Sequence, residues 1–396
     1  MSGRLAAVVV SLGLFAIACR GAEPTFQSVA IFPSEPKHNH ASCVIELGNG
    51  DLLVAWYRGS GERSADDVQI LGAWLRKGSV LWGPRFTLAD TPGYPDCNPA
   101  LFAAPDHTIW LFWPTILNHH WEGALLKFAV AQDNGVHSGP LAWTREGVLH
   151  VTPIGFEKEM ARAIAAIPPA DAKRYTRVLE QVVERSKDEL YQRLGWMPRV
   201  HPTVLPSGRW LLPLYCDTFS ASIVAMSDDR GASWSTSGPI IGFGAIQPSL
   251  VRKDDGSIVA FMRDNGPFHR IRLSTSRDEG KTWGPVTSSS FLNPGAGVEA
   301  TRLANGHWIL IYNDSDKGRY TLAVSLSDDE GATWKWTRHV EVQPAGSGSF
   351  HYPSIMQARN GLIHATYTHG TPAGNTIQHV RFNEEWVIRG NAASSH

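Results

Sequence analysis

An eight-residue pattern recurs three times in the second half of this chain, and it constrains the fold more than any other feature. The copies read Ser-x-Asp-x-Gly-x-(Ser/Thr)-Trp, end at Trp234, Trp283 and Trp334, and each follows a short apolar segment. The Asp is suited to bond the turn backbone, the Gly to take a positive φ, and the Trp to pack the turn onto the next strand, as in a hairpin. A repeat with a period of roughly 50 residues is typical of a propeller or a solenoid.

This pattern resembles the Asp-box, or bacterial neuraminidase repeat, of the sialidase superfamily. The resemblance implies an all-β chain, a six-bladed sialidase-like β-propeller over residues 23–396. It indicates the fold rather than the activity, because Asp-boxes lie in turns remote from the active site and also occur in proteins that are not sialidases. The function has to be argued from other residues.

The chain supplies six units of similar design, each with an apolar strand, a Gly turn, a second strand and a Trp near its end. The segment Ser28–Phe32 is left over, and we predict that it pairs with the sixth unit and closes the ring, which removes an exposed sheet edge. The units begin at His40, Asn98, Arg199, Gln247, Gly297 and Tyr352.

Residues 156–194 break this rhythm. They are rich in Glu, Lys, Arg and Ala, with apolar residues at helical spacing that is interrupted at Pro168-Pro169. We predict a helical hairpin inserted between blades two and three. Two roles stay open for it, a solvated cap on the outside of the ring or a lid over the central pocket.

The N-terminus has the pattern of a signal peptide over residues 1–22. Arg4 precedes an apolar run that reaches Ala18, too short and wrongly flanked for a spanning helix. We therefore predict an exported protein, periplasmic or extracellular. The end of the run loosely resembles a bacterial lipoprotein cleavage box, which would put a lipid anchor at Cys19, but the usual Leu is missing and simple secretion is preferred.

Composition excludes several classes of partner. The formal net charge is −1, so there is no electrostatic reason to expect nucleic acid or a membrane surface. Cys43, Cys97 and Cys216 remain after cleavage, and at most one disulfide forms among them. The cysteines and histidines do not have the spacing of a zinc site, and we predict no metal and no cofactor.

The centre of a propeller is lined by the starts of its innermost strands, so the first residues of the six units are candidate site residues. Five of the six are polar, which a structural core would not favour. His201, Glu299 and His351 lie close by in the sequence. The ends of the strands after the turns add Arg58, Tyr215, Asp217, Arg263, Asn313 and His369.

The resemblance to sialidases implies roles for some of these residues. Sialidases hold a substrate carboxylate with three arginines and use a Tyr nucleophile, a Glu that assists it and an Asp general acid/base. Tyr352, nine residues before Gly361, resembles the nucleophile of the last blade. Arg263 and Arg319 resemble the second and third arginines.

The first-blade loop supplies the other matches. Asp66 and Asp67 fall in the loop that carries the acid/base Asp in sialidases, and Arg58 resembles the arginine that closes the strand before it. Two positions depart from the family pattern, because His40 stands where the first arginine is expected and Gln247 where the Glu is expected. A neutral amide cannot take the proton of the Tyr. These departures favour an acidic-glycan hydrolase of altered specificity.

The same chemistry follows from the residue types. Paired Arg side chains bind a sugar carboxylate bidentately, and a Tyr needs an adjacent base or cation to become a nucleophile. The candidates for activating Tyr352 are Arg263, His351 and Glu299. Structural roles remain open for several of these residues: Arg263 and Arg319 paired with Asp264 or Asp316, Tyr352 packed in its blade, Asp66 or Asp67 capping a loop, and His40 and His201 satisfied internally.

Three functions are compatible with this sequence. The leading hypothesis is a secreted, exo-acting, sialidase-like glycoside hydrolase that acts on a sialic- or uronic-acid-containing glycan. The second is a polysaccharide lyase for uronic-acid glycans, with His40, His201 or Tyr352 as the base and an arginine that neutralises the carboxylate. The third is a glycan-binding propeller without catalytic activity. Gln247 favours the second and third functions, and the products released would discriminate between all three.

Overall fold

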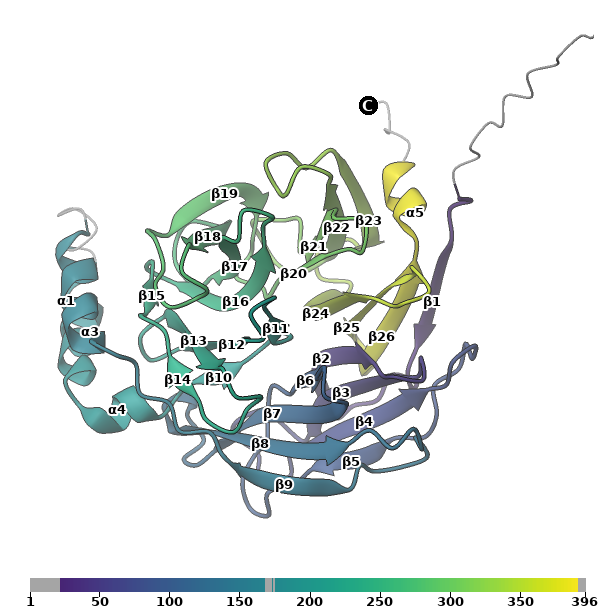
Figure 1. Ribbon diagram of the computed structural model, residues 1–396, viewed down its shortest axis with the longest axis horizontal. Coiled ribbons are helices and arrows are strands. Elements are labelled where there is room, and N and C mark those ends of the chain that lie inside the picture. Colours follow the sequence, from purple (N-terminus) through teal and green to yellow (C-terminus); the bar gives the residue numbers. More distant parts are fainter. Residues whose placement is uncertain (1–21, 168–172, 174, 391–396) are drawn as a thin grey trace, which may run out of the picture.

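The computed structural model describes residues 22–167, 173 and 175–390, whose strands form six sheets around a common centre (Figure 1). The predicted six-bladed propeller is confirmed. Blades one to three contain β2 (His38–Glu46), β3 (Leu52–Gly59), β4 (Gln69–Leu75) and β5 (Phe86–Ala89); β6 (Ala100–Ala103), β7 (Thr108–Ile116), β8 (Ala124–Gln132) and β9 (Trp143–Val148); and β10 (Met197–Pro198), β11 (Thr203–Val204), β12 (Trp210–Cys216), β13 (Ala221–Ser227), β14 (Ser235–Thr236) and β15 (Ile240–Ile241).

Blades four to six follow the same antiparallel order. Their strands are β16 (Ala245–Arg252), β17 (Ile258–Asp264), β18 (Arg270–Ser276) and β19 (Thr287–Leu292); β20 (Glu299–Arg302), β21 (Trp308–Tyr312), β22 (Thr321–Ser327) and β23 (Trp336–Val342); and β24 (Ser349–Gln357), β25 (Ile363–Thr371), β26 (Gly374–Phe382) and β1 (Phe26–Ala30). In each blade the first strand lies nearest the centre (Figure 1).

An N-terminal strand closes the ring, as predicted, although it begins two residues earlier than expected. β1 runs antiparallel to β26, from the pair Phe26↔Phe382 to the pair Ala30↔Gln378. It ends before Phe32 because that side chain turns into the core and stacks on Trp56, with ring centroids 5.2 Å apart. The ring is therefore held shut by backbone hydrogen bonds between the two ends of the described chain.

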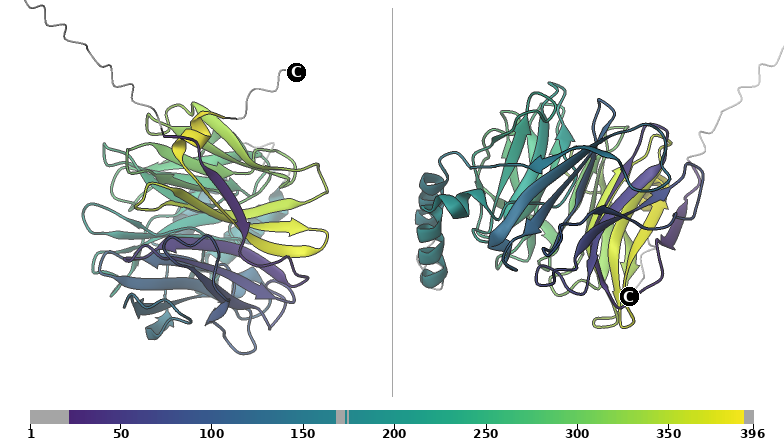
Figure 2. Two further views of the ribbon diagram at one scale, coloured as in Figure 1. Left: turned by 90° about the vertical axis from the view of Figure 1, so that its right-hand side faces the viewer. Right: turned by 90° about the horizontal axis from the view of Figure 1, so that it is seen from below.

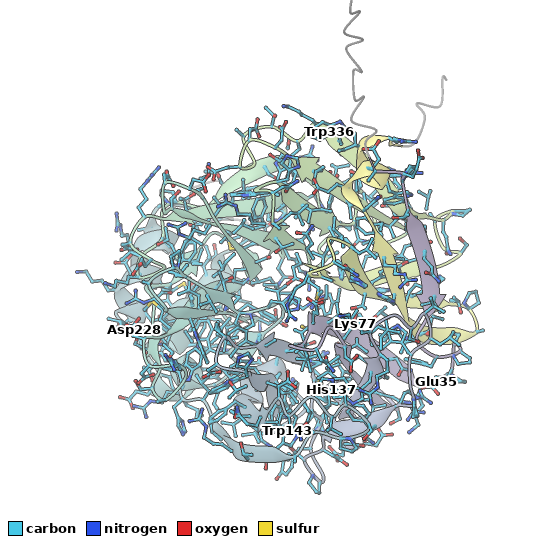
Figure 3. All side chains as sticks on the ribbon, turned by 45° about the vertical axis from the view of Figure 1, so that its right-hand side comes forward. Glu35, Lys77, His137, Trp143, Asp228 and Trp336 are labelled. Atoms are coloured by element: carbon cyan, nitrogen blue, oxygen red, sulfur yellow. The ribbon has the colours of Figure 1, made fainter. Side chains whose placement is uncertain are left out.

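The three Asp-boxes form one hydrogen-bonded turn repeated in three blades. In the first, Ser227 Oγ donates to the Asp229 carboxylate and accepts from the backbone N–H of Gly231, while the Ser233 N–H and hydroxyl both donate to Asp229. The same contacts recur around Asp278 and Asp329. Asp228, beside the first turn, lies at the outer edge of the ring (Figure 3).

The aromatic residues of the Asp-boxes pack between blades. The sequence had suggested that this Trp packs the turn onto the next strand. Trp234 instead contacts Trp110 and Phe112 of the preceding blade. Trp110 of blade two also meets Trp210 of blade three edge-on, with ring centroids 5.6 Å apart. These large buried rings fill the wedge-shaped space between sheets, where aromatic pairs are favourable.

The predicted helical insert is present and lies at the periphery. α1 (Phe156–Ala165), α3 (Thr176–Ser186) and α4 (Glu189–Arg193) stand beside blade three, away from the centre of the ring (Figures 1 and 2). Phe156 anchors α1 against Trp196 and Phe219. The break predicted at Pro168-Pro169 lies outside the described residues. Two short helices complete the fold, η1 (Trp121–Gly123) and α5 (Glu384–Ile388).

Cys43, Cys97 and Cys216 are buried free thiols, so no disulfide joins the described part of the chain. None of the helices that the structure describes is long and apolar enough to cross a membrane. The predicted signal peptide, with Cys19, precedes the described residues.

Candidate active site

The innermost strands of several blades are distorted at the same position. Ala41, Asn98, Gln247 and Tyr352 all have positive φ, between 42° and 57°. Strand pairing breaks around three of them, between His40 and Cys43, Ile246 and Ser249, and His351 and Ser354. A positive φ on a residue other than Gly is unfavourable, and such strain is concentrated at functional sites. The bulges mark one ring of positions around the centre.

Tyr352 is the hub of the site. Its hydroxyl accepts hydrogen bonds from Arg263 Nη1 at 3.1 Å and from Gln247 Nε2 at 3.2 Å. The guanidinium groups of Arg199 and Arg319 lie over its ring, 4.7 and 5.6 Å from the centroid. Four side chains from blades three to five therefore meet at the phenol of blade six, and the donors at its hydroxyl are arranged to stabilise negative charge on its oxygen.

Gly297, the fifth-blade residue of the predicted rim, provides the space for this convergence. A Cβ atom on Gly297 would stand 3.0 Å from Tyr352 Cδ1, 3.1 Å from Gln247 Oε1 and 3.5 Å from Arg199 Nε. The first two separations are tighter than ordinary van der Waals contact. A side chain here would push the hub apart, which explains why the one apolar member of the rim is a glycine.

Arg319 is positioned by His351 and by backbone. It donates to His351 Nδ1 at 2.7 Å and to the Gly295 carbonyl at 2.7 Å. Because an arginine only donates, Nδ1 carries no proton, and His351 Nε2 is the nitrogen that faces Ser349 Oγ at 2.6 Å. Burial and the charge of Arg319 lower the pKa of His351 to about 3. The imidazole is therefore neutral at ordinary pH.

His40 is a second neutral imidazole beside the hub. Its ring lies 4.5 Å from the Tyr352 ring, and its Nδ1 is 3.1 Å from the hydroxyl oxygen of Thr368. Burial, reinforced by the charges of neighbouring histidines and arginines, holds the pKa of His40 well below its usual value. It stands where sialidases are expected to carry an arginine, and it brings no positive charge there.

Arg199, His201 and Glu299 lie beneath the hub as a buried floor. Arg199 is 1% exposed and donates to the Pro353 carbonyl at 2.8 Å. His201 Nδ1 meets Glu299 Oε1 at 2.6 Å, and Nε2 meets the Val44 carbonyl at 2.7 Å, so both ring nitrogens donate and the ring is cationic. Burial raises the pKa of Glu299, but the charge and hydrogen bond of His201, the charge of Arg199 and the Ile355 N–H together lower it below its usual value.

This ion pair lines a cavity that does not include Tyr352. Its volume is ≈ 380 Å³, and its other lining residues lie further along the inner strands and in the turns that follow them. The structure thus separates two groups that the sequence placed together: Tyr352, Arg263, Arg319, Gln247, His40 and His351 around the hub, and His201 and Glu299 below it.

Asp66 and Asp67 belong to the loop between β3 and β4 and hold that loop in place. Asp66 meets His119 Nε2 at 2.6 Å. Asp67 accepts from the Ser60 N–H, the Ser60 hydroxyl and Lys37, and these contacts hold its pKa well below its usual value, with the Lys37 bond as the largest cause. Their side chains are 55% and 42% exposed, and neither contacts Tyr352 in these hydrogen bonds.

Arg58 and Asn98 are also engaged elsewhere. Arg58 binds Glu35 bidentately, at 2.6 and 3.3 Å, and Glu35 lies toward the edge of the ring (Figure 3). Asn98 Nδ2 donates to Tyr215 Oη at 3.2 Å, next to the hub. Arg58 is therefore the one predicted arginine that does not point to the centre.

Two further carboxyl groups lie near this centre: Glu62, which the sequence did not single out, and Asp217, which it named only as a candidate at a strand end. Glu62, in the β3–β4 loop, accepts from Tyr57 Oη at 2.5 Å. Asp217 follows the end of β12, two residues after Tyr215, and its charge acts on both Tyr215 and Arg263. The sequence pointed to Asp217 by its place at a strand end, whereas nothing in the loop sequence singled out Glu62 over its neighbours. In the described residues no group of three or more His, Cys, Asp or Glu side chains is placed to hold a metal ion.

Comparison with known proteins identifies the family of this propeller. The family model described as a BNR repeat-like domain matches residues 50–158 and 194–365, more than half of the chain, and skips most of the helical insert. A sialidase of Micromonospora viridifaciens is 25% identical over 180 residues, which are 42% of this chain and 26% of that protein. The chain thus matches only about a quarter of that relative's length.

Solved structures show the same fold at low identity. A protein of unknown function from Dyadobacter fermentans matches with a TM-score of 0.67 and 18% identity over 90% of this chain and 99% of its own. A variant of the NanB sialidase of Streptococcus pneumoniae has a TM-score of 0.67 and 13% identity, covering 90% and 70%. A leech intramolecular trans-sialidase has a TM-score of 0.67 and 12% identity, covering 91% and 71%.

Proposed function

Because this chain belongs to the BNR repeat-like domain family, we propose that it is a sialidase-like glycoside hydrolase that removes an acidic sugar from the end of a glycan. The observation that carries the proposal is the convergence of Arg263 and Arg319, from neighbouring blades, on Tyr352. Two fixed guanidinium groups beside a phenol provide both a carboxylate grip and a nucleophile in one site.

Five residues of the site have roles in this reaction. Arg263 and Arg319 hold the carboxylate of the sugar ring and so fix its anomeric carbon against Tyr352. Sialidases use a tyrosine nucleophile in place of the second carboxylate of other glycosidases. Negative charge that develops on the Tyr352 oxygen is stabilised by the donors Arg263 and Gln247. Gly297 keeps the space in which these groups meet.

The substrate is expected to differ from an ordinary sialoside. Gln247 donates to the Tyr352 hydroxyl and cannot take its proton, and His40 does not supply the positive charge of a third arginine. A site with two guanidinium groups that pair with no carboxylate of the described residues suits a single ring carboxylate, as in a sialic or uronic acid. We propose an acidic oligosaccharide or polysaccharide as the substrate.

A uronate lyase is the second candidate, and one observation favours it. Two neutral imidazoles, His40 and His351, stand beside Tyr352, and no carboxylate among the described residues hydrogen-bonds to its hydroxyl. In a lyase, Tyr352 or His40 would remove the proton next to the carboxylate while an arginine neutralises the charge. The product would carry a double bond and absorb ultraviolet light.

Product analysis separates these functions. The purified protein would be incubated with sialylated and uronic-acid glycans, and the released sugars would be identified by mass spectrometry and ultraviolet absorbance. Release of an intact acidic monosaccharide supports the hydrolase, and an unsaturated product supports the lyase. Tyr352→Phe should remove most of the activity in either case. Saturable glycan binding without release by the wild type would instead make this a glycan-binding propeller.

We also propose export, on the basis of the N-terminal pattern of residues 1–22. Cleavage would free the chain close to the start of β1. The mature protein would be isolated from the periplasm or culture medium and its N-terminus sequenced. Recovery only from the cytoplasm with Met1 intact would contradict export, and a lipid-modified Cys19 would show that the protein is anchored rather than freely secreted.

A further inference from the structure

The hub lacks an obvious proton donor, and the carboxyl groups around it differ in whether they are free to act. Most of them are engaged by partners that hold them in place. The engaged groups and their partners are Glu62 with Tyr57, Asp66 with His119, Asp67 with Lys37 and Ser60, Glu122 with Arg185, and Glu299 with His201.

Asp217 is the exception. Its carboxyl group forms no hydrogen bond or ion pair with any side chain or backbone group in the part of the chain that the structure describes, although the residue is only partly exposed. A partly buried carboxyl group without a partner is unfavourable, and such groups call for an explanation. A functional role is a common explanation, because a free carboxyl group at the wall of a site can contact a substrate.

The position of Asp217 fits this reading. It follows β12 two residues after Tyr215, whose hydroxyl contacts Asn98 of the rim. The charged groups that face it come from three neighbouring elements: Arg263 on β17, Glu62 and Arg63 in the β3–β4 loop, and Glu122 in η1. The charge of Arg263 acts on both Asp217 and Tyr352, and Arg263 donates to the Tyr352 hydroxyl at 3.1 Å.

The surroundings of this carboxyl group raise its pKa. Burial is the largest influence and raises the pKa of Asp217; the charge of Arg263 opposes it, and the charge of Glu62 adds to it. The neighbouring carboxyl group behaves differently, since Glu62 accepts a hydrogen bond from Tyr57 and is held as an acceptor.

We propose that Asp217 is the proton donor to the leaving oxygen, in place of Asp66 or Asp67. This inference rests on the proposed hydrolase function. As the bond between the anomeric carbon and the bridging oxygen breaks, its electron pair stays on the oxygen, and the Asp217 O–H proton moves to that oxygen to form the leaving alcohol. The Tyr352 oxygen bonds to the anomeric carbon and its phenolic proton passes to water.

The second half of the cycle restores both groups. A water molecule adds its hydroxyl to the anomeric carbon and gives its proton to the Asp217 carboxylate. The bond between the anomeric carbon and Tyr352 breaks, and its electron pair stays on the phenol oxygen. This oxygen then takes a proton from solvent. The sum is one glycoside and one water converted to a sugar and an alcohol. No oxidant, metal or further reactant is needed.

Dependence on the leaving group tests the proposal. Two glycosides of the same acidic sugar would be compared, one with a 4-nitrophenol leaving group, which needs little protonation, and one with an alkyl alcohol, which needs it. For Asp217→Asn, kcat/KM should fall by about 100- to 10,000-fold with the alkyl glycoside and far less with the aryl glycoside. The alkaline limb of the pH profile should also disappear. Asp228→Asn, at the outer rim, should not change kcat/KM for either substrate.

Several outcomes would overturn the assignment. Equal losses with both substrates, or none, would mean that Asp217 does not protonate the leaving group. If Glu62→Gln shows the leaving-group signature and Asp217→Asn does not, the donor is Glu62. Asp217→Glu keeps an acid, and its partial activity would separate chemistry from misfolding. If the wild type cleaves neither glycoside, the hydrolase function fails and this inference fails with it, whereas a normal wild type with an unaffected Asp217→Asn would leave the function standing.

Discussion

The side-chain amide of Gln247 donates a hydrogen bond of 3.2 Å to the hydroxyl group of Tyr352. The two residues lie 105 positions apart, on the distorted inner strands of blades four and six. Sialidases are expected to have a glutamate at this place, which would accept the proton of the tyrosine. One oxygen atom replaced by an amide nitrogen therefore reverses the direction of the hydrogen bond at the centre of the site.

Gln247→Glu should restore an acceptor beside Tyr352. Release of sialic acid from an aryl sialoside should rise above the wild-type level, because the new carboxylate can take the tyrosine proton. The measurement is the rate of aryl alcohol release at several pH values. Gln132→Glu, on the exposed face of β8, is the matched control and should not change the rate. A rise in both variants, or in neither, would contradict this view of Gln247.

Arg319→Ala should remove one arm of the carboxylate grip. Loss of a buried charge-assisted contact to the substrate costs about 2–5 kcal/mol, or roughly 30- to 4,000-fold in kcat/KM. Arg209→Ala is the control, because Arg209 pairs with Asp228 at the outer rim. Steady-state kinetics with the acidic glycoside and with a neutral analogue would check the prediction. An equal loss on the neutral analogue would show that Arg319 supports the fold rather than the carboxylate.

Asp278→Ala should lower stability without changing the chemistry. The variant loses the acceptor for the Ser276 hydroxyl and for the Thr282 N–H and hydroxyl. The expected loss is about 1–3 kcal/mol in the free energy of unfolding, measured by denaturant titration. Arg277→Ala changes an exposed neighbour and should have little effect. Activity lost at an unchanged Tm would mean that this turn takes part in catalysis.

Glu35→Gln should reveal a pH-dependent contribution at the ring closure. The hydrogen bond from Arg58 is the main reason that the pKa of Glu35 falls from 4.5 to about 2. A depressed folded-state pKa stabilises the protein above pH 4.5, and this stabilisation is lost as the pH falls toward 2. The difference in Tm between wild type and Glu35→Gln should therefore be largest near pH 6 and shrink between pH 4.5 and pH 2. A constant difference across that range would contradict the ion pair.

The sequence by itself determined the fold because its main signals are local. Each Asp-box is completed by contacts between residues two and four positions apart, such as Ser227 with Asp229 and with Gly231. A turn that closes within eight residues is encoded wherever those residues occur. Its repetition indicates the spacing of the blades, and the recurring Gly turn and Trp indicate their number. The helical insert was predictable for the same reason, since helical periodicity is also local.

Only the tertiary structure decided which site residues meet. Arg263 and Tyr352 are 89 positions apart, and their contact depends on the curvature of the ring and on the bulge at Tyr352. The sequence also did not show which cation each carboxyl group would bind. Asp67, for example, has several cations within reach along the chain, and the fold selects Lys37. Residue type and register identify candidates, whereas contacts between blades, burial and charge determine which of them, such as Asp217, remain free to react.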